Sequence, residues 1–467
     1  MDAAVTQALA DFCAGLKAAS LPEAVRTRTR FLVLDLAGNI LRARHEAEST
    51  PALLAAARAI GAYGGSSIVL GDGPGWSPAG AALLNGALAH SLDFDDTHAA
   101  GSLHPGAPVI PAAFAAAEMN GASGAEVMAA IVAGYEVTCR VALALPAGAH
   151  YDRGFHPTAT CGVFGAAAAA ARVFGLDGKG IADAFGIALS QAAGSLQFLK
   201  NGAWTKRFQV GWSALSGLSA ATLAREGFLG AAEALEGKHG FMRAYAPSPA
   251  PARALEQLGT VWELMNTAVK PYPSCRYGHA AIDAAIALRA ELGLQPEEIE
   301  RVTVGLPAKG MLLVGAPAEK KANPENVVDG QFSGPFVVAA ALATGAMGWD
   351  SYRLLQDPAI RALLPRISCE QDPEIEAEFP RNMSGKLTVV ARGRTHMRKV
   401  VVPKGEPDNF LTADELKAKF FGLADTVLGH GQAVLLADAL LAFDAALGMR
   451  AVLRHAIPQA TARLAGN

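Results

Sequence analysis

The sequence predicts a mainly α-helical protein, with a large all-helical domain and a smaller α+β domain. Three observations carry this prediction. Residues 3–260 are rich in alanine and leucine at helical spacing and contain few β-branched runs. The first strand-like alternation appears at Ile299–Leu306, and the pattern is helical again over Ala413–Leu464. The C-terminal segment is therefore expected to return and pack on the first domain.

Each part of the pattern places a boundary or an element. Small residues in Val163–Phe174 and Gly186–Ser195 predict helices that pack very closely. The prolines at 271 and 273 mark the change from the helical pattern to a region that also contains strand-like patterns. The expected elements are a helix over about 278–292, a strand over 299–306 and a hairpin over 386–402 that turns at Gly393. The expected domains are an all-helical domain of residues 1–269 and 404–467 and an α+β domain of residues 270–403.

Composition excludes several classes of protein. The chain has 467 residues, 51% of them hydrophobic, which is long enough for two cores. The net charge of −3 comes from scattered residues, so we expect neither nucleic acid nor a membrane surface as a partner. No apolar run approaches the roughly 20 residues of a membrane span, and Met1-Asp2-Ala3 does not begin a secretory signal. We expect a cytoplasmic protein.

The five cysteines are odd in number and far apart in the sequence, at positions 13, 139, 161, 275 and 369. They predict reduced thiols and offer no Cys-x-x-Cys spacing for zinc or iron–sulfur clusters.

The segment from Asn85 to His98, with His104 beyond it, has the densest set of ionisable groups. Three carboxylates and three histidines lie within the fifteen residues from 90 to 104. Such groups are expensive to bury without partners, which favours a functional site over a solvated helix end, although that alternative stays open. Asp93-x-Asp95-x-Thr97 matches a phosphatase motif formally, but here it follows a helical rather than a strand pattern. No 2-His-1-carboxylate set is readable from spacing, so no metal is predicted.

A second polar segment runs from Gly154 to Gly162. His156-Pro-Thr158-Ala-Thr160 leads into an alanine-rich helix, and the threonines are natural N-caps. A helix N-terminus favours an anion, so a substrate carboxylate is expected against these amides with His156. The alternative is a simple capping turn.

A third segment, Lys200–Gly211, places Lys206 and Arg207 in an otherwise apolar, glycine-rich stretch. Adjacent cations there predict a local anion site. A solvated basic face is the alternative.

The fourth segment, Trp262–His279, lies at the inferred domain junction. Its prolines present Arg276, Tyr277 and His279 at the start of a helix, where a cleft between domains is expected. The alternative is a structural hinge whose polar side chains satisfy backbone groups.

Together the four segments resemble the MmgE/PrpD family over nearly the whole chain. The matching motifs are His-x-x-Asp-Phe-Asp-Asp-Thr from 90, Gly-x-His-Pro-Thr from 154, Thr-Lys-Arg from 205 and Lys-Pro-Tyr-Pro-x-Cys-Arg-Tyr-x-His from 270. The resemblance implies a helical domain with a smaller lid, a homodimer, an active site in the cleft, and no organic cofactor. Members commonly have histidine where this chain has Gln209. The site residues that it implies are Asp93, Thr97, His104, His156, Lys206 and His279.

The family's reactions share one demand, since negative charge develops beside a carboxylate that is already anionic. We expect the substrate to be a small di- or tricarboxylate whose carboxylates are held by Lys206, Arg276 and His156. His104 is the first choice for general acid/base, oriented by Asp93, and His279 is the second. The predicted site comprises catalytic His104, Asp93, His279 and Lys206, and substrate-binding Thr97, His156, Arg276, Tyr277 and Arg207.

Three reactions and one non-enzymatic role follow from this resemblance. A hydro-lyase similar to 2-methylcitrate dehydratase is the favoured reaction. The alternatives are an epimerase of an amino- or imino-dicarboxylate such as iminodisuccinate, a decarboxylase of the cis-aconitate type, and a carboxylate-binding protein without turnover.

Overall fold

The computed structural model describes residues 4–146 and 148–459. The chain divides into two compact units: residues 1–268 with 413–467, and residues 269–412. The helical stretches expected from residue 3 and up to Leu464 have their outermost ends outside the described residues.

Residues 404–412 belong to the smaller unit, whereas the sequence analysis placed them in the helical domain. Hydrogen bonds explain the difference. The Val269 amide donates to the Gly405 carbonyl at 2.9 Å, and the Lys404 amide donates to Asp283 at 2.7 Å. These bonds tie the segment to the start of the smaller unit.

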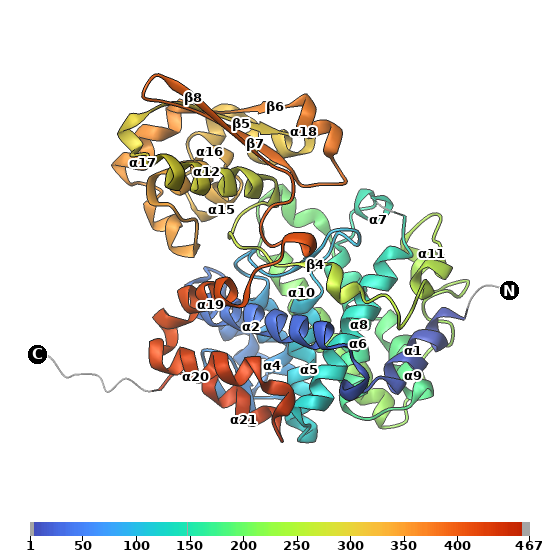
Figure 1. Ribbon diagram of the computed structural model, residues 1–467. Coiled ribbons are helices and arrows are strands. Elements are labelled where there is room, and N and C mark those ends of the chain that lie inside the picture. Colours follow the sequence, from blue (N-terminus) through green and yellow to red (C-terminus); the bar gives the residue numbers. More distant parts are fainter. Residues whose placement is uncertain (1–3, 147, 460–467) are drawn as a thin grey trace, which may run out of the picture. The chain divides into compact units, whose positions relative to one another are not determined.

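The larger unit is built mainly from helices, which confirms the predicted fold class (Figure 1). The C-terminal helices α19 and α20 pack against α2. Its helices are α1 (Val5–Gly15), α2 (Glu23–Glu46), α3 (Thr50–Ala59), α4 (Pro78–Ala89), α5 (Gly106–Asn120), α6 (Gly124–Leu143), α7 (Ala149–Asp152), α8 (Pro157–Val173), α9 (Gly178–Leu189), α10 (Thr205–Arg225), α11 (Phe241–Tyr245), α19 (Ala413–Leu428), α20 (His430–Leu441) and α21 (Met449–Leu453).

Small residues bring the central helices into very close contact. A Cβ added at Gly165 of α8 would lie 1.8 Å from Oγ1 of Thr138 on α6. One added at Gly217 of α10 would lie 2.4 Å from the Ala166 Cβ. The backbones at these crossings therefore approach too closely for any side chain, as the alanine- and glycine-rich pattern predicted.

The larger unit is not entirely helical, and this part of the prediction is wrong. Strand β1 (Tyr63–Val69) pairs antiparallel with β2 (Gly73–Trp76), and β3 (Thr97–His98) pairs antiparallel with β4 (Thr267–Ala268). The first pair is rich in glycine and serine, so it lacks the usual alternation of a strand. The second pair joins residues that are far apart in the sequence and ties the Thr97 segment to the end of the larger unit's first part.

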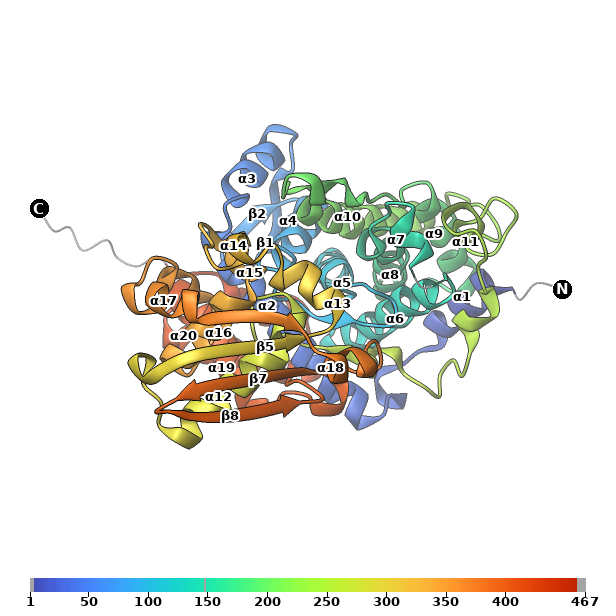
Figure 2. The ribbon, with the colours of Figure 1, turned by 90° about the horizontal axis from the view of Figure 1, so that it is seen from above.

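The smaller unit contains a four-stranded sheet of order β6-β5-β7-β8 (Figure 2). Strands β5 (Ile299–Leu306) and β6 (Ile367–Gln371) are parallel, and the pairs with β7 (Gly385–Ala391) and β8 (Arg394–Val400) are antiparallel. Helices α12 (His279–Leu292) and α16 (Gly334–Thr344) contribute to the core beside the sheet. The predicted strand over 299–306, the hairpin and the helix are confirmed, and β6 was not predicted.

Shorter helices complete the smaller unit. These are α13 (Ala308–Gly310), α14 (Ala318–Lys321), α15 (Val327–Gln331), α17 (Pro358–Leu363) and α18 (Pro373–Glu378). Among residues 4–146 and 148–459, no helix combines the length and the apolarity of a membrane span.

Candidate active site

The segment with the most ionisable groups begins in helix α4 and continues directly after it. Ser77 caps its N-terminus by accepting a hydrogen bond from the Gly80 amide at 3.0 Å, and the helix ends at Ala89 so that His90 follows directly. Asp93 then has φ +53°, a left-handed conformation that is uncommon for residues other than glycine. Backbone strain of this kind concentrates at functional sites, and here it separates the directions of the three aspartates that follow the helix.

Asp93 forms an ion pair with Lys206, which lies in the first turn of α10. Their side chains meet at 2.7 Å and are 18% and 27% exposed. Burial opposes the charge on Lys206, but the attraction of Asp93 and then Asp95 outweighs it and raises the pKa of the ammonium. Lys206 is therefore a cation that stays charged in a largely desolvated place.

Asp95 lies against two imidazoles. Its Oδ2 atom is 2.7 Å from Nδ1 of His90 and 3.4 Å from Nδ1 of His104. Burial alone would raise the pKa of Asp95, but the two histidines hold it well below its usual range. His90 is fully buried, and this burial lowers its pKa to about 4. At neutral pH the trio thus contains an ionised carboxylate and a neutral His90.

His156 joins the same cluster from the start of α8. Its ring centroid lies 5.9 Å from that of His90, and its Nδ1 lies 3.2 Å from Oε1 of Gln209. Burial, followed by His90, Lys206 and His104, lowers the pKa of His156 well below its usual range. A neutral imidazole therefore lies beside the side-chain amide of Gln209.

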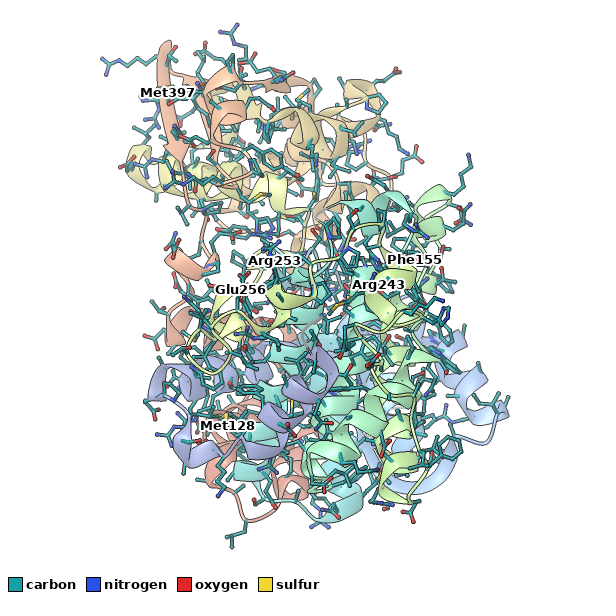
Figure 3. The ribbon with its side chains drawn as sticks, turned by 90° about the vertical axis from the view of Figure 1, so that its right-hand side faces the viewer. Met128, Phe155, Arg243, Arg253, Glu256 and Met397 are labelled. Carbon is teal, nitrogen blue, oxygen red and sulfur yellow. The ribbon has the colours of Figure 1, made fainter. Side chains whose placement is uncertain are left out.

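The threonines of this segment do not cap the helix, which corrects the expectation from the sequence. His156 itself occupies the cap position and its side chain makes no capping bond. Thr158 instead accepts a hydrogen bond from the His104 amide at 3.2 Å, and thereby fixes the backbone of that residue. The preceding Phe155, labelled in Figure 3, packs its ring 4.7 Å from that of Tyr245.

Thr97 and Arg207 have different surroundings. Thr97 lies in β3, and its buried Oγ1 has no hydrogen-bond partner among the described residues, so this hydroxyl is available to a ligand. Arg207 donates a hydrogen bond to Ser49 Oγ at 3.0 Å, at the start of α3. Because neighbours on a helix point about 100° apart, Arg207 and Lys206 do not share one direction.

Arg276, Tyr277 and His279 belong to the smaller unit. Arg276 forms an ion pair with Glu406, and His279 Nε2 lies 3.1 Å from the Ser274 carbonyl, to which it donates. Burial raises the pKa of Tyr277. Arg276 and Tyr277 lie in a 3₁₀ turn directly before α12, and His279 is the first residue of that helix, so the three residues stand at its start as the sequence predicted. Their role in a site rests on the resemblance.

Two members of the cluster, His90 and Asp95, were not among the predicted site residues. Both lie in the motif that carries the resemblance, but spacing alone does not reveal which aspartate meets which histidine. With His104 they place three possible ligand atoms within 4.8 Å, an arrangement of two histidines and one carboxylate that spacing did not show. The 2.7 Å contact between His90 and Asp95 is itself a good hydrogen bond.

A separate cavity of about 870 Å³ occurs elsewhere in the larger unit. The predicted site residues do not line it, and its acidic and basic groups offset each other. Its charged lining residues include Arg243, labelled in Figure 3, with Lys179, Asp183, Glu233, Glu236 and Lys238.

The geometry of the larger unit thus defines an acid–base site beside a partly buried cation. Comparison with protein families agrees: the model of the MmgE/PrpD N-terminal domain matches residues 7–254, and that of the C-terminal domain matches residues 272–442. The chain belongs to the MmgE/PrpD family, as its motifs predicted.

Several curated proteins are similar along most of their length. A cis-aconitate decarboxylase-like protein, oryM, of Aspergillus oryzae is 29% identical over 94% of each chain. The cis-aconitate decarboxylase of Aspergillus terreus is 25% identical over 81% of each chain, and that of Homo sapiens is 28% identical over 79% of this chain and 77% of its own. These relatives confirm the coarser expectation of an enzyme of the lyase class.

Proposed function

We propose that this chain is a cofactor-independent decarboxylase of a small unsaturated tricarboxylic acid similar to cis-aconitate. The observation that carries the proposal is a cluster in the larger unit in which one partly buried cation lies among imidazoles and carboxylates. Its members are Lys206, Asp93, Asp95, His90, His104 and His156. The names of the relatives favour decarboxylation over the other reactions of the family.

Lys206 supplies the cation that the reaction requires. When the bond to the departing carboxylate breaks, carbon dioxide leaves and its electron pair stays on the substrate, next to carboxylates that are already anionic. An ammonium in a desolvated place offsets this charge far more strongly than one in water. In the resting protein Asp93 balances Lys206 at 2.7 Å, and an incoming carboxylate would share it.

His104 is the group proposed to move the proton. Decarboxylation consumes one proton at carbon, and an imidazole near neutral pH is suited to deliver it. Its side chain is 16% exposed, whereas His90 is fully buried, so His104 is the more accessible of the two. His279 of the smaller unit is carried over by the resemblance alone and remains the second candidate.

Dehydration of a hydroxy acid similar to 2-methylcitrate is the second candidate function. One observation favours it: His156 is neutral because of its burial, and beside the Gln209 amide it offers a base next to a hydrogen-bonding group for a hydroxyl.

The experiment is incubation of the purified protein with unsaturated, hydroxy- and amino-dicarboxylic and tricarboxylic acids in heavy water, followed by proton and carbon NMR. Decarboxylation releases carbon dioxide and places deuterium on the product carbon. Dehydration forms an alkene without carbon dioxide, and epimerisation labels the substrate with neither change. Absence of turnover with every acid would refute the proposal and leave a carboxylate-binding protein.

A further inference from the structure

The carboxylate of Asp95 connects two imidazoles of unequal exposure. We propose that Asp95, held in place by His90, is the positioning carboxylate of His104, so that Nδ1 of His104 carries a proton and Nε2 is left for the substrate. This inference rests on the proposed function. It adds two residues, His90 and Asp95, that act through His104 rather than on the substrate.

The contacts of Asp95 and His104 support this role. Asp95 has no exposed side-chain surface, and its Oδ2 lies 2.7 Å from His90 Nδ1 and 3.4 Å from His104 Nδ1. The rings of His90 and His104 meet edge to face, with their centroids 4.6 Å apart. Thr158 fixes the backbone of His104 through its amide. Ring packing, carboxylate and backbone thus restrict His104 to a narrow range of orientations.

The protonation states follow from the same contacts. Asp95 is ionised because the two histidines keep its pKa low, and His90 is neutral because burial lowers its pKa to about 4. A neutral His90 next to a carboxylate must place its single proton on Nδ1, where it donates to Oδ2. His104 Nδ1 lies 3.4 Å from the same oxygen without completing a hydrogen bond, so its proton is also favoured on Nδ1, and the contact should shorten as His104 becomes charged.

Several other ionisable groups lie around His104. His90 and His156 are neutral, and Lys206 is a cation paired with Asp93. Of the groups in this cluster, Asp95 is therefore the anion placed to stabilise a protonated His104.

The neighbouring Asp96 provides a matched control. It is also buried, but it accepts from Tyr135 at 2.6 Å and from the Gly106 amide at 3.2 Å. Burial raises the pKa of Asp96 to about 8, so it is largely uncharged at neutral pH. Asp96→Asn thus changes a buried carboxyl one residue away while leaving the charge near His104 almost unchanged.

The first test is the pH profile of kcat/KM for Asp95→Asn. We expect kcat to fall by about 10²- to 10⁴-fold, since the wrong tautomer of a catalytic histidine has effects of this size. The basic limb should also move to lower pH, because His104 loses the anion that stabilises its protonated, proton-donating form. Asp96→Asn should leave the limb in place. A purely structural role for Asp95 would lower kcat without moving the limb, and would overturn the proposal.

The second test uses His90 variants. The side-chain amide of asparagine places a donor where histidine has Nδ1, so His90→Asn should retain more turnover than His90→Leu, which offers no donor to Asp95. Equal turnover in the two variants would show that the hydrogen bond to Asp95 is irrelevant.

The third test needs no activity and no variant of Asp95. Nitrogen NMR of the protein labelled with ¹⁵N-histidine distinguishes protonated from unprotonated ring nitrogens, and the His104→Gln spectrum assigns the resonances. We expect Nδ1 of His104 to be protonated at neutral pH, with Nε2 as the nitrogen that gains the proton it later delivers. The opposite tautomer would overturn the proposal even if the enzyme were active, whereas the expected tautomer in an inactive protein would indicate failure of the proposed function alone.

Discussion

The ammonium of Lys419 lies 2.8 Å from the backbone carbonyl of Phe94 and 3.7 Å from the centroid of its ring. Lys419 belongs to α19, near the C-terminus, and it also pairs with Asp35 of α2 at 2.5 Å. Phe94 stands between the two aspartates of the candidate site. The C-terminal part of the chain therefore holds the segment that carries Asp93 and Asp95.

Lys419→Met should destabilise the protein by roughly 3 kcal/mol, because removing one partner of a buried ion pair leaves the other charge without compensation. Both side chains are at most 6% exposed. Urea denaturation measures the change. The double variant Lys419→Met with Asp35→Asn removes both charges and should recover part of the loss. A single variant as stable as the original protein would contradict this assignment.

Lys206→Met should lower kcat/KM by about 10- to 100-fold, since hydrogen bonds to charged groups contribute roughly 1.5–3 kcal/mol. The adjacent Arg207 is the control, because its contact is with Ser49. We expect Arg207→Met to retain turnover, as measured by steady-state kinetics. If the Arg207 variant lost more activity than the Lys206 variant, the assignment of the anion site to Lys206 would be wrong.

The free energy of unfolding should fall as the pH falls from 7 to 5. Burial lowers the pKa of His90 and of His150 from 6.5 to about 4. Between these values the unfolded chain binds protons that the folded protein excludes, so stability is present above pH 6.5 and is lost toward pH 4. Between pH 7 and pH 5 each histidine should lower the free energy of unfolding by about 2 kcal/mol.

His150→Gln tests that dependence. His150 lies with Nε2 2.8 Å from Thr160 Oγ1 and is distinct from the candidate active-site cluster. The variant should show a shallower loss of stability between pH 7 and 5 in urea titrations. An unchanged slope would mean that His150 titrates alike in the folded and unfolded states.

Removal of divalent metal ions should leave turnover unchanged. In the resting protein Nδ1 of His90 and Oδ2 of Asp95 are already joined by a hydrogen bond. Dialysis against EDTA followed by the activity assay checks this. Loss of activity that is restored by one divalent ion would instead identify His90, Asp95 and His104 as its ligands.

The fold was predictable where patterns are local. Strand β5 and the hairpin of β7 and β8 alternate in the sequence, and α12 follows directly after a proline-rich entry. The β3–β4 pair was not predictable, because it joins residues 97–98 to residues 267–268 and no local pattern encodes such a contact.

The candidate site was predictable as a set of segments but not as a geometry. Asp93 was expected to orient His104, yet it pairs with Lys206, and Asp95 takes the place beside His104. The reason is the left-handed backbone at Asp93, which redirects the residues after it. Sequence spacing does not determine a turn of that kind when the residue is not glycine.

The most direct test of the account is the turnover of His104→Gln with the acid that the unmodified enzyme consumes. We predict that kcat falls by about 10²- to 10⁴-fold, while binding of the acid, measured by calorimetry, stays within a few-fold. Turnover close to that of the unmodified enzyme would contradict the claim that His104 moves the proton in the cluster around Asp95.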